Sequence, residues 1–422
     1  MAKSSISMAN LYIFNESTRA AVFGIGTYTR ELTVALKDCE INVCMVHIRS
    51  EKPDAEPEEL EGIRHFYIPQ PTIRNSTSDW KRQTELYYKN VVYLLRMQIK
   101  DTEKLIFHIN YNQTGILAEE LKRAFVCRVV AVVHYSDWGA IIYDNQKRLQ
   151  SILQDEKPDD FNKNLKKSVE EEKLSYSKMD RIICLSNYMF DILLRDYKLD
   201  AAKISVIPNS LTDRAKTNNP KRFLRKKWKI ADREKIILFA GRIDAIKGIE
   251  YLLKAFRDVL NKFPHSRLII AGDGAFSKYT KESQDICTKI TYTGLLDKEL
   301  LYEWYSMADV GVTPSLFEPF GYVAVEMMMH ELPIVATATS GLNEVVDETC
   351  GLKVPLLQTN DNVEIDTGFL AEKIVYLLEH PDYAKKLGAN ARKRYEQLYS
   401  MEVFRKNMMD FYHSLYEEPI FH

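Results

Sequence analysis

Short apolar runs alternate with longer amphipathic segments along the first half of the chain. The runs are rich in β-branched residues and lie at Leu11 to Phe14, Ile41 to Ile48, Ile63 to Ile68, Lys104 to Ile109, Val129 to Val133, Arg181 to Leu185 and Ile204 to Ile207. A helix is expected after Gly26, following the first run. This alternation predicts a doubly wound parallel α/β sheet.

The alternation restarts in the second half. Strands are expected at Lys235 to Ala240, Ser266 to Ala271, Ile290 to Thr293, Val310 to Thr313 and Pro333 to Ala336, with a helix at Gly248 to Asn261. Beyond Asp366 the pattern is helical to Tyr416, with Gly388 as a weak interruption. Two doubly wound sheets in tandem leave a cleft between them, and ligands of such sheets bind outside the carboxyl ends of the strands.

The polar, Lys- and Arg-rich stretch from Leu211 to Arg233 separates the two series and is interpreted as an interdomain linker with a flanking helix. We therefore predict a first domain at 1–210, a second at 211–400, and a C-terminal helix at 401–422 that crosses back to the first domain. The polar stretch from Asp144 to Tyr176 is interpreted as helical or loop material inserted near the cleft.

Composition narrows the class of protein. A chain of 422 residues exceeds what one core usually serves. Lys and Arg number 58 against 59 for Asp and Glu, so no overall field favours nucleic acid as a partner. The apolar runs are too short for a membrane span and the N-terminus lacks a signal-peptide layout, so a cytoplasmic protein is expected. The scattered cysteines, without any Cys-x-x-Cys pair, predict reduced core thiols and no zinc site or disulfide framework.

The first candidate motif is the glycine turn Phe23-Gly24-Ile25-Gly26-Thr27, which follows the first strand and opens a helix. Backbone N–H groups and the helix dipole favour an anion at such a place. The motif lacks the third glycine of a dinucleotide fingerprint, because position 29 is Thr. A tight strand-to-helix turn without any ligand remains the alternative.

The second motif, Gly241-Arg242-Ile243-Asp244 with Lys247-Gly248, places two cations where a strand ends and a helix starts. The planar guanidinium of Arg242 and the compact ammonium of Lys247 together suit a diphosphate. A solvated helix start is the alternative.

The third motif runs from Thr313 to Glu326, between a strand and a helix whose N-terminus is formed by Phe320 to Tyr322. The carboxylate of Glu318 can accept hydrogen bonds from sugar hydroxyls there, and Glu326, eight positions later, can reach another part of an elongated ligand. Two hydroxyl-bearing regions on one ligand fit a nucleotide sugar. Alternatively, Glu318 is an ordinary capping carboxylate and Glu326 a surface residue.

The Glu318-to-Glu326 segment resembles the Glu-x7-Glu signature of the retaining GT-B glycosyltransferases of family 4, the glycosyl transferases group 1 type. Further matches run in order along most of the chain and comprise Gly24 and Gly26, His134, Cys184-Leu185-Ser186, Val206-Ile207-Pro208-Asn209, Gly241-Arg242 with Lys247-Gly248, Ala271-Gly272-Asp273-Gly274 and Thr293-Gly294. The resemblance implies the GT-B fold, with an acceptor-side first domain, a nucleotide-sugar donor domain and the donor in the cleft between them.

The resemblance also implies roles for individual residues. Glu318 would hold hydroxyls of the transferred sugar and Glu326 the ribose, with Arg242 and Lys247 on the diphosphate. The amides of Phe320, Gly321 and Tyr322 would line the sugar and phosphate, Gly294 and Leu295 would border the base, and Gly24 and Gly26 would approach the phosphates and the acceptor. His134 would lie over the reacting carbon, although a core histidine is its alternative.

Two departures from the family pattern concern the first domain. Asn209-Ser210 stands where the family often has Asn-Gly, and Tyr135 follows His134 without an acidic residue immediately after the histidine. The turn and the second polar partner of His134 are therefore not fixed by the resemblance. Acceptor-side residues cannot be carried over.

The expected reaction is a metal-independent hexosyl transfer with retention, in glycan biosynthesis. Arg242 and Lys247 would stabilise the leaving diphosphate in place of a metal ion, and the sequence contains no Asp-x-Asp pair. No cofactor is expected beside the nucleotide-diphosphate sugar, which is the donor substrate. The acceptor would be a glycan, a lipid-linked glycan or a peptide.

Two other functions remain open. The glycine turn and the two Rossmann-like halves also suit an NAD(P)-dependent oxidoreductase, in which Arg49 could hold a 2′-phosphate. A non-catalytic nucleotide-sugar-binding protein would keep the same donor residues.

A membrane contact is a further alternative. Lys81, Arg82, Lys89, Arg96, Lys100 and Lys104 surround an aromatic and apolar helix containing Tyr87, Tyr88, Tyr93, Leu94, Leu95 and Met97, and a second basic cluster runs from Lys221 to Lys229. Such a helix can lie on an anionic bilayer, here at the inner membrane surface. We favour the interpretation that it packs its apolar stripe on the core and solvates its charges.

Overall fold

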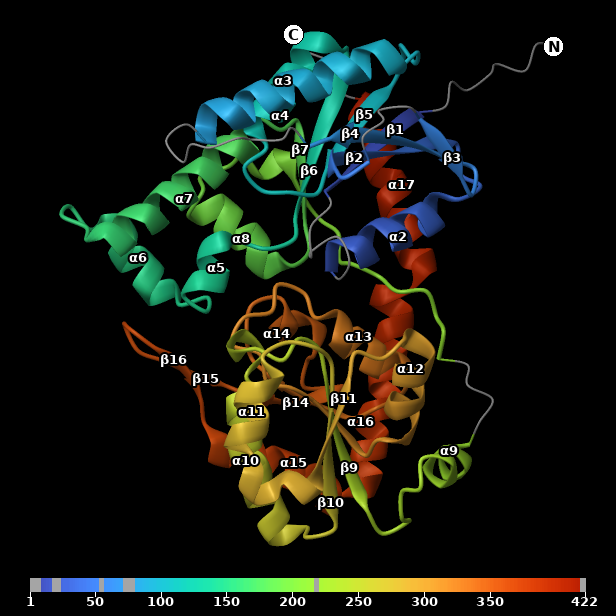
Figure 1. Cartoon of the computed structure of the whole chain (residues 1–422), viewed down its shortest axis with the longest axis vertical. Helices are drawn as coiled ribbons and strands as arrows, with labels where there is room; N and C mark the ends of the chain where they lie inside the picture. Colours follow the sequence, from blue (N-terminus) through green and yellow to red (C-terminus); the bar gives the residue numbers. More distant parts are fainter. Residues whose placement is uncertain (1–8, 17–23, 53–56, 71–79, 216–219, 418–422) are drawn as a thin grey trace. The chain divides into compact units, whose positions relative to one another are not determined.

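The computed structural model describes residues 9–16, 24–52, 57–70, 80–215 and 220–417 of the chain. Phe23 of the glycine turn lies outside this part. The chain divides into two compact units: the first comprises 1–136, 164–207 and 404–422, and the second comprises 137–163 and 208–403. Each unit is an α/β domain built on its own sheet (Figure 1).

The first unit contains an eight-stranded sheet in the order β3-β4-β2-β1-β5-β6-β7-β8. Its strands are β1 (Ala9–Glu16), β2 (Ile41–Ser50), β3 (Glu58–Leu60), β4 (Ile63–Pro69), β5 (Leu105–Ile109), β6 (Cys127–Val133), β7 (Arg181–Cys184) and β8 (Ile204–Val206). All neighbours pair in parallel except β3 and β4. In register, Leu11 of β1 lies between Val43 and Ile106. The strands are apolar on both faces because a parallel sheet is covered on both faces by helices.

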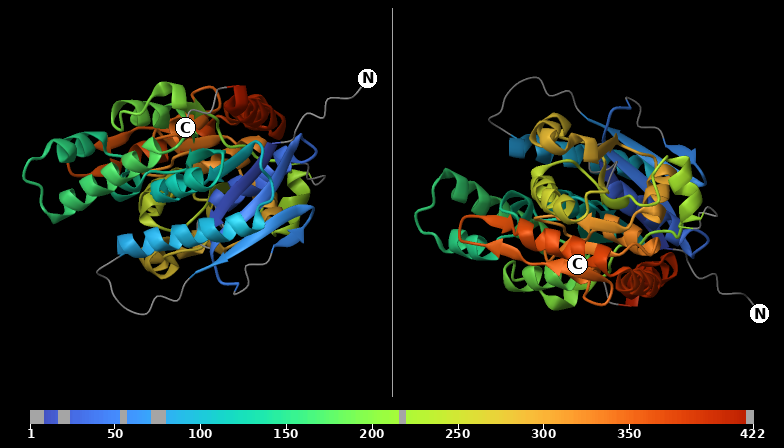
Figure 2. Two further views of the ribbon diagram at one scale, coloured as in Figure 1. Left: turned by 90° about the horizontal axis from the view of Figure 1, so that it is seen from above. Right: turned by 90° about the horizontal axis from the view of Figure 1, so that it is seen from below.

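Helices of the first unit connect and cover these strands. They are α2 (Gly24–Leu36), α3 (Trp80–Gln98), α4 (Gly115–Ala124), most of α7 (Asp160–Ser177), α8 (Asn187–Arg195), the short 3₁₀ turn at Ala201–Lys203, and α17 (Met401–Glu417). In the left view of Figure 2, α3 and α17 lie on opposite sides of the strands. The C-terminal helix packs on α2, where Arg405 Nε donates to the carbonyl of Ala35 at 2.7 Å.

The second unit contains a six-stranded parallel sheet in the order β11-β10-β9-β12-β13-β14. Its strands are β9 (Lys235–Ala240), β10 (Ser266–Ala271), β11 (Ile290–Gly294), β12 (Val310–Thr313), β13 (Ile334–Thr337) and β14 (Gly351–Val354), and a separate antiparallel ribbon joins β15 (Leu356–Gln358) to β16 (Val363–Ile365). Renumbered from β9, the order reads 3-2-1-4-5-6, which is the order of dinucleotide-binding α/β sheets.

The second unit also contains helices, several of which pack on this sheet. They are α5 (Asp137–Ile141), α6 (Gln146–Gln154), α9 (Lys221–Lys227), α10 (Ile249–Lys262), α11 (Phe276–Glu282), α12 (Lys298–Met307), α13 (Tyr322–Met329), α14 (Leu342–Val345), α15 (Thr367–Glu379) and α16 (Pro381–Arg394), with 3₁₀ turns at Ala245–Lys247 and Gln284–Lys289 and a π-turn at Tyr395–Tyr399. Helix α10 packs against α15, and α13 against α16. The core between α10, α15 and the sheet includes Leu252, Phe256, Leu268, Leu370 and Ile374.

The segment 137–163 is bound to the second unit although it lies far earlier in the chain. Ser340 Oγ donates to Asp144 Oδ2 at 2.7 Å, and Asn145 Nδ2 donates to the carbonyl of Thr359 at 2.8 Å. The sequence predicts one continuous stretch at 1–210 for the first domain, whereas the structure assembles each unit from separate segments.

One local expectation is wrong. Gly388 lies inside α16 and does not interrupt it. A Cβ at this position would lie 2.0 Å from the carbonyl oxygen of Glu331, so close packing against the end of α13 requires the glycine. The helical stretch after Asp366 is instead divided at His380 and at Ser400.

Candidate functional site

The second and third motifs meet where the strand order of the second sheet reverses. Strands β9 and β12 are neighbours, and the chain leaves them toward opposite edges of the sheet. Arg242 follows β9 and Glu318 follows β12. Both motifs therefore occupy the topological switch point, which is where open α/β sheets bind their ligands.

The two loops at this point are in direct contact. The N–H of Leu316 donates to the carbonyl of Ile246 at 2.8 Å. Gly248 has a φ of +69° and approaches the other loop so closely that a Cβ would lie 1.8 Å from the carbonyl oxygen of Pro314. Only glycine fits there, and it lets the Lys247 turn press against the loop that carries Glu318.

Lys247 and Glu318 form an ion pair between these loops. The Nζ atom of Lys247 bonds Oε2 of Glu318, and the two side chains are 19% and 20% exposed. Ser315 Oγ also donates to the same oxygen, at 3.4 Å. Arg242, by contrast, pairs with Asp244 at 3.2 Å and is 46% exposed, so its guanidinium can reach a ligand from solvent.

The backbone of the Glu318 loop is fixed by residues from the next strand and helix. Thr337 Oγ1 donates to the carbonyl of Ser315 at 2.5 Å, and Thr339 Oγ1 donates to that of Leu316 at 2.9 Å. The N–H of Leu342 donates to the carbonyl of Glu318 itself at 3.1 Å. Sequence reasoning missed both threonines, because a hydroxyl that bonds a distant carbonyl leaves no local pattern.

Helix α13 begins directly after this loop. Gly321 precedes its first residue, Tyr322, with a φ of +106° that favours glycine. Phe320 is buried, and its ring meets the ring of Tyr322 edge-on at 5.3 Å between centroids. The positive end of the helix dipole thus lies beside the Glu318 loop, where it favours an anion.

Glu326 is buried inside the unit, only 1% exposed, so its interpretation as a surface residue is wrong. Tyr305 OH donates to Glu326 Oε2 at 2.9 Å, and Lys298 Nζ forms an ion pair with Oε1. Burial and the neighbouring carboxylate raise the pKa of Tyr305 well above its usual range. Lys298 is 46% exposed and therefore covers this carboxylate from the solvent side.

Lys298 and Tyr305 are residues that the sequence analysis did not single out. Lys298 is the first residue of α12 and lies three positions after Leu295. Gly294 and Leu295, the residues expected to border a base, are exposed at the end of β11. Lys298 thus joins the loop assigned to the base to the carboxylate assigned to the ribose.

The remaining candidates, Gly24, Gly26 and His134, lie in the first unit. Gly24 and Gly26 are in the first turn of α2, after β1, and His134 follows β6. Strands β1 and β5 mark the point where the strand order of this sheet reverses, as β9 and β12 do in the other. The structure thus brings Arg242, Lys247, Gly294, Leu295, Phe320 to Tyr322 and both glutamates into the second unit. The other three candidates lie in the first unit, with Gly24 and Gly26 after β1 at its switch point and His134 after β6, the next strand beyond β5.

His134 is held by neighbours on adjacent elements. Its Nε2 atom lies 3.0 Å from Asn110 Oδ1, and its ring meets the edge of Tyr28 at 4.7 Å between centroids. Burial and the nearby His108 lower the pKa of His134 to about 3. The ring is therefore neutral at physiological pH. It can donate a hydrogen bond from one nitrogen and accept one at the other, but it does not act as a general acid.

The residues considered for a 2′-phosphate and for a membrane contact are placed as follows. Arg49, the candidate for a 2′-phosphate, forms an ion pair with Glu16 at 2.6 Å. On α3, Tyr87, Tyr88 and Leu95 are buried on the core as expected, whereas Tyr93 and Met97 are exposed. Among the described residues, no helix has the length and apolar character needed to cross a membrane.

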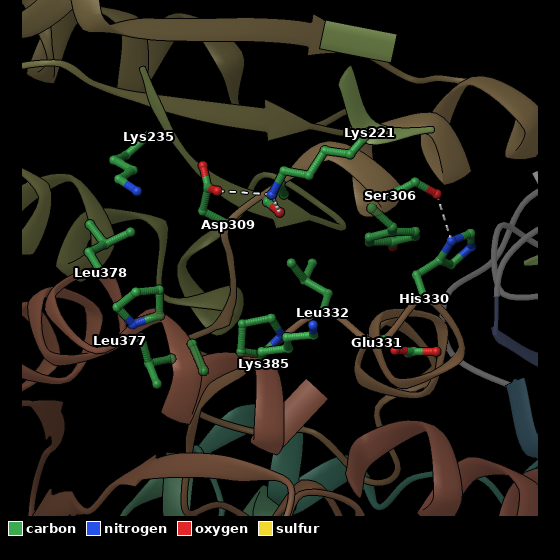
Figure 3. A pocket seen from close by; sticks show the side chains of 15 residues that line it. Lys221, Lys235, Ser306, Asp309, His330, Glu331, Leu332, Leu377, Leu378 and Lys385 are labelled. Carbon is green, nitrogen blue, oxygen red and sulfur yellow. Dashed lines mark hydrogen bonds and ion pairs between the residues drawn. The ribbon is translucent and has the colours of Figure 1, made fainter. Parts of the chain in front are cut away.

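A separate cavity of about 280 Å³ lies at the amino ends of strands in the second unit (Figure 3). Lys221 and Asp309 form an ion pair of 2.9 Å in its wall, and His330 lies 3.0 Å from Ser306 Oγ. None of the predicted site residues lines it. In the described ranges, no cluster of three or more His, Cys, Asp or Glu side chains is arranged to hold a metal ion.

Comparison with known families matches both halves of the chain. Residues 22–212 match the family described as Glycosyltransferase Family 4, and residues 220–394 match Glycosyl transferases group 1. The chain is 38% identical over 123 residues to an uncharacterised glycosyltransferase of Methanocaldococcus jannaschii, covering 28% of this chain and 30% of that protein. It is 25% identical over 251 residues to the alpha-D-kanosaminyltransferase of Streptomyces kanamyceticus, covering 58% and 63%. The chain thus spans less than two thirds of the length of these curated relatives.

Solved structures share the fold over nearly the whole chain. Sucrose-phosphate synthase from Thermosynechococcus elongatus superposes with a TM-score of 0.76 at 23% identity, covering 97% of this chain and 99% of that one. The Anabaena protein HepE, solved in complex with UDP and glucose, has a TM-score of 0.68 at 17% identity, covering 96% and 100%. At these identities the likeness establishes the α/β fold of the two units.

Proposed function

The chain belongs to the group 1 glycosyl transferases, and on that premise we propose that it transfers a sugar from a nucleotide-diphosphate sugar to an acceptor hydroxyl. We further propose retention of the anomeric configuration, a hexosyl group as the transferred sugar, and independence of a metal ion. The Lys247–Glu318 ion pair at the switch point of the second sheet is the observation that carries the proposal. It offers one cation and one carboxylate side by side, which are the groups that a diphosphate and a sugar ring respectively require.

Each candidate then has a definite role in holding the donor. Lys247 and the exposed Arg242 bind the diphosphate, and Glu318 accepts hydrogen bonds from sugar hydroxyls. The backbone of Phe320, Gly321 and Tyr322 lines the phosphate and the sugar at the start of α13. Glu326 holds the ribose, with Lys298 and Tyr305 fixing its carboxylate. Gly294 and Leu295 border the base, while Gly24, Gly26 and His134 serve the reacting end of the donor and the acceptor.

The chemistry follows from the charge that develops during transfer. Breaking the bond between sugar and diphosphate creates oxocarbenium character on the sugar and negative charge on the leaving oxygen. Fixed cations near that oxygen stabilise the transition state more than the ground state. Attack from the same face, with a donor phosphate oxygen taking the acceptor proton, gives retention without a covalent enzyme intermediate.

Independence of a metal is supported by the sequence and by the cations present. The chain lacks an Asp-x-Asp pair, and Arg242 and Lys247 supply positive charge at the phosphates. The acceptor is proposed only by class, as a hydroxyl of a glycan, a lipid-linked glycan or a peptide. The similar proteins are named for different sugars and acceptors, so they do not narrow this choice.

The proposal is tested by Glu318→Ala and Lys247→Ala. Each variant should lose transfer by at least about a hundredfold, because a preorganised group that stabilises developing charge contributes on that scale. The matched control is Lys254→Ala, which removes an exposed lysine paired with Glu250 on α10. It should retain full activity. Full activity of Glu318→Ala or Lys247→Ala, with an unchanged circular dichroism spectrum, would refute the assignment.

Two other functions make different predictions. A non-catalytic nucleotide-sugar binder would bind a donor but release no nucleoside diphosphate with any acceptor. An NAD(P)-dependent oxidoreductase would quench or shift the fluorescence of a reduced nicotinamide cofactor when it binds. The ion pair between Arg49 and Glu16 disfavours the second of these, because it neutralises the cation that would hold a 2′-phosphate.

A further inference from the structure

Asn110 lies at the carboxyl end of β5, between the strand that precedes the glycine turn and the strand that precedes His134. It is 1% exposed. Its Nδ2 atom donates to the carbonyl oxygen of Phe14 in β1 at 3.1 Å, and its Oδ1 atom lies 3.0 Å from Nε2 of His134. One buried amide thus bridges three adjacent elements of the first sheet.

These two contacts determine where the proton of His134 resides. The carbonyl of Phe14 can only accept, so the NH₂ group of Asn110 must face it. The amide oxygen then faces His134, and because this oxygen can only accept, Nε2 of the imidazole must carry the hydrogen. In a neutral ring the other nitrogen, Nδ1, is consequently an acceptor.

The surroundings keep the ring in this orientation and leave Nδ1 available. The edge of Tyr28 packs against His134, and the hydroxyl of Tyr28 lies 3.2 Å from Nε2 of the fully buried His108. Tyr412 from α17 lies 2.9 Å from the other nitrogen of His108, so the wall behind His134 is itself hydrogen-bonded. Within the described part of the chain, no side chain or backbone group bonds Nδ1 of His134, and the residue is partly exposed.

We propose that Asn110 is a positioning residue: it holds His134 as the Nε2–H tautomer and thereby presents Nδ1 as a hydrogen-bond acceptor for a hydroxyl of the bound sugar. The assignment of the tautomer depends only on the contacts within the first unit. The sugar hydroxyl as partner rests on the proposed function. The low pKa of His134 agrees with this, since a ring that must accept at Nδ1 has to stay neutral.

The tautomer is tested directly by NMR of protein labelled with ¹⁵N-histidine, with no donor or acceptor added. The His134 resonances are assigned by their loss in His134→Gln. In the wild type they should show protonated Nε2 and unprotonated Nδ1 at pH 7. A protonated Nδ1 would overturn the proposal, whatever reaction the protein catalyses.

Variants of Asn110 test whether this residue sets the tautomer. Asn110→Ala should give a mixture of the two tautomers, whereas Asn110→Gln keeps both the amide oxygen and the NH₂ group and should restore the Nε2–H form. The control is Asn42→Ala. It removes another asparagine of the first unit, which lies at the start of β2 and whose amide NH₂ group donates to Asn10 in β1. It should leave the His134 resonances unchanged. A pure Nε2–H form in Asn110→Ala would show that Asn110 does not position the ring.

Kinetics separate this role from a merely structural one. Asn110→Ala should lower kcat/KM for transfer by about tenfold, the scale of one hydrogen bond, and Asn110→Gln should recover part of the loss. Equal losses in both variants, with an intact tautomer in Asn110→Gln, would contradict the role assigned to Nδ1. If Asn110→Ala does not fold, the wild-type spectrum and Asn110→Gln still decide the question.

Discussion

Burial keeps individual histidines of the first unit uncharged. His108 is fully buried, and desolvation lowers its pKa to about 3, while that of His134 is also lowered to about 3. An unfolded histidine titrates near pH 6.5. Because the folded pKa lies below the unfolded one, the stability due to the neutral ring is fully present above about pH 6.5. It is lost as the pH falls toward about 3.

This linkage predicts an acid-dependent loss of stability. Between about pH 5.5 and pH 4, His108 should reduce the free energy of unfolding by about 1.4 kcal/mol per pH unit. Urea denaturation of the wild type and of His108→Gln at several pH values isolates this contribution, since the other titrating groups are common to both proteins. Parallel pH dependences in the two proteins would show that His108 does not resist protonation.

Single residues also show how far the sequence predicts the site. Lys247 and Glu318 could be predicted because each follows the carboxyl end of a strand, and parallel strands place these ends at one edge. Tyr305, Lys298 and Asn110 could not be predicted. Their importance comes from single contacts across 21, 28 and 24 residues of chain, which no local spacing records.

At the scale of elements, the contact between the Lys247 turn and the Glu318 loop depends on one glycine. Gly248 and Gly294 both have left-handed backbones, with φ of +69° and +71°. A Cβ at Gly248 would collide with the carbonyl of Pro314, whereas a Cβ at Gly294 would meet nothing within 4 Å. An alanine at Gly294 would therefore introduce backbone strain alone, whereas an alanine at Gly248 would introduce the same strain and a steric collision.

Alanine at each position gives a matched prediction. Gly294→Ala should cost about 1 kcal/mol, the cost of a left-handed alanine. Gly248→Ala should cost at least about 3 kcal/mol, because the loop must also move. Chemical denaturation measures both. Equal losses for the two variants would mean that the loops are not packed as closely as the structure places them.

Elements differed in how well the sequence predicted them. The expected strands from Lys235 to Ala240, Ser266 to Ala271 and Val310 to Thr313 have the observed bounds, because each is a short, mainly apolar run that a glycine or a proline follows. Strands β3, β14, β15 and β16 escaped prediction, since each has three or four residues and at least one of them is polar or charged. The three residues of β8 are in a mostly apolar run that the sequence analysis did recognise. The expectation for Gly388 was wrong because it used helix propensity alone. The glycine is required by the close approach of the Glu331 carbonyl, which leaves no room for a side chain on α16.

At the scale of the whole molecule, α17 completes the first unit from the far end of the sequence. Phe404 and Tyr412 are buried, with Phe404 edge-on to Tyr28 at 6.0 Å and Tyr412 bonded to His108. Helical periodicity predicted the helix. The structure shows in addition that Phe404 and Tyr412 of this helix contact Tyr28 and His108, which lie next to His134.

Truncation of either side chain should therefore destabilise the first unit. Phe404→Ala and Tyr412→Ala should each lower the free energy of unfolding by about 3–5 kcal/mol, the usual effect of removing a buried aromatic ring. Lys406→Ala, on the exposed side of the same helix and paired with Asp410, is the control and should change it by less than about 0.5 kcal/mol. Equal stabilities for Phe404→Ala and Lys406→Ala would show that α17 does not belong to the core.

The assignment of 137–163 to the second unit shows the limit of sequence reasoning at this scale. The polar segment has the pattern of surface helices, and the hydrogen bonds that attach it, such as that from Ser340 to Asp144, join residues 196 positions apart. The unit to which such a segment belongs is therefore decided by its tertiary contacts, which the pattern of polar and apolar residues does not reveal.

The most direct test of the central claim is a panel of nucleotide-diphosphate sugars, assayed for thermal stabilisation and for release of the nucleoside diphosphate. A donor present at a hundred times its Kd should stabilise the wild type by about 2.7 kcal/mol and raise its Tm. We predict that at least one donor does so and is turned over, and that the same donor neither stabilises nor reacts with Lys247→Ala. If no donor of the panel stabilises the wild type, or if Lys247→Ala responds as strongly, the account of the site is contradicted.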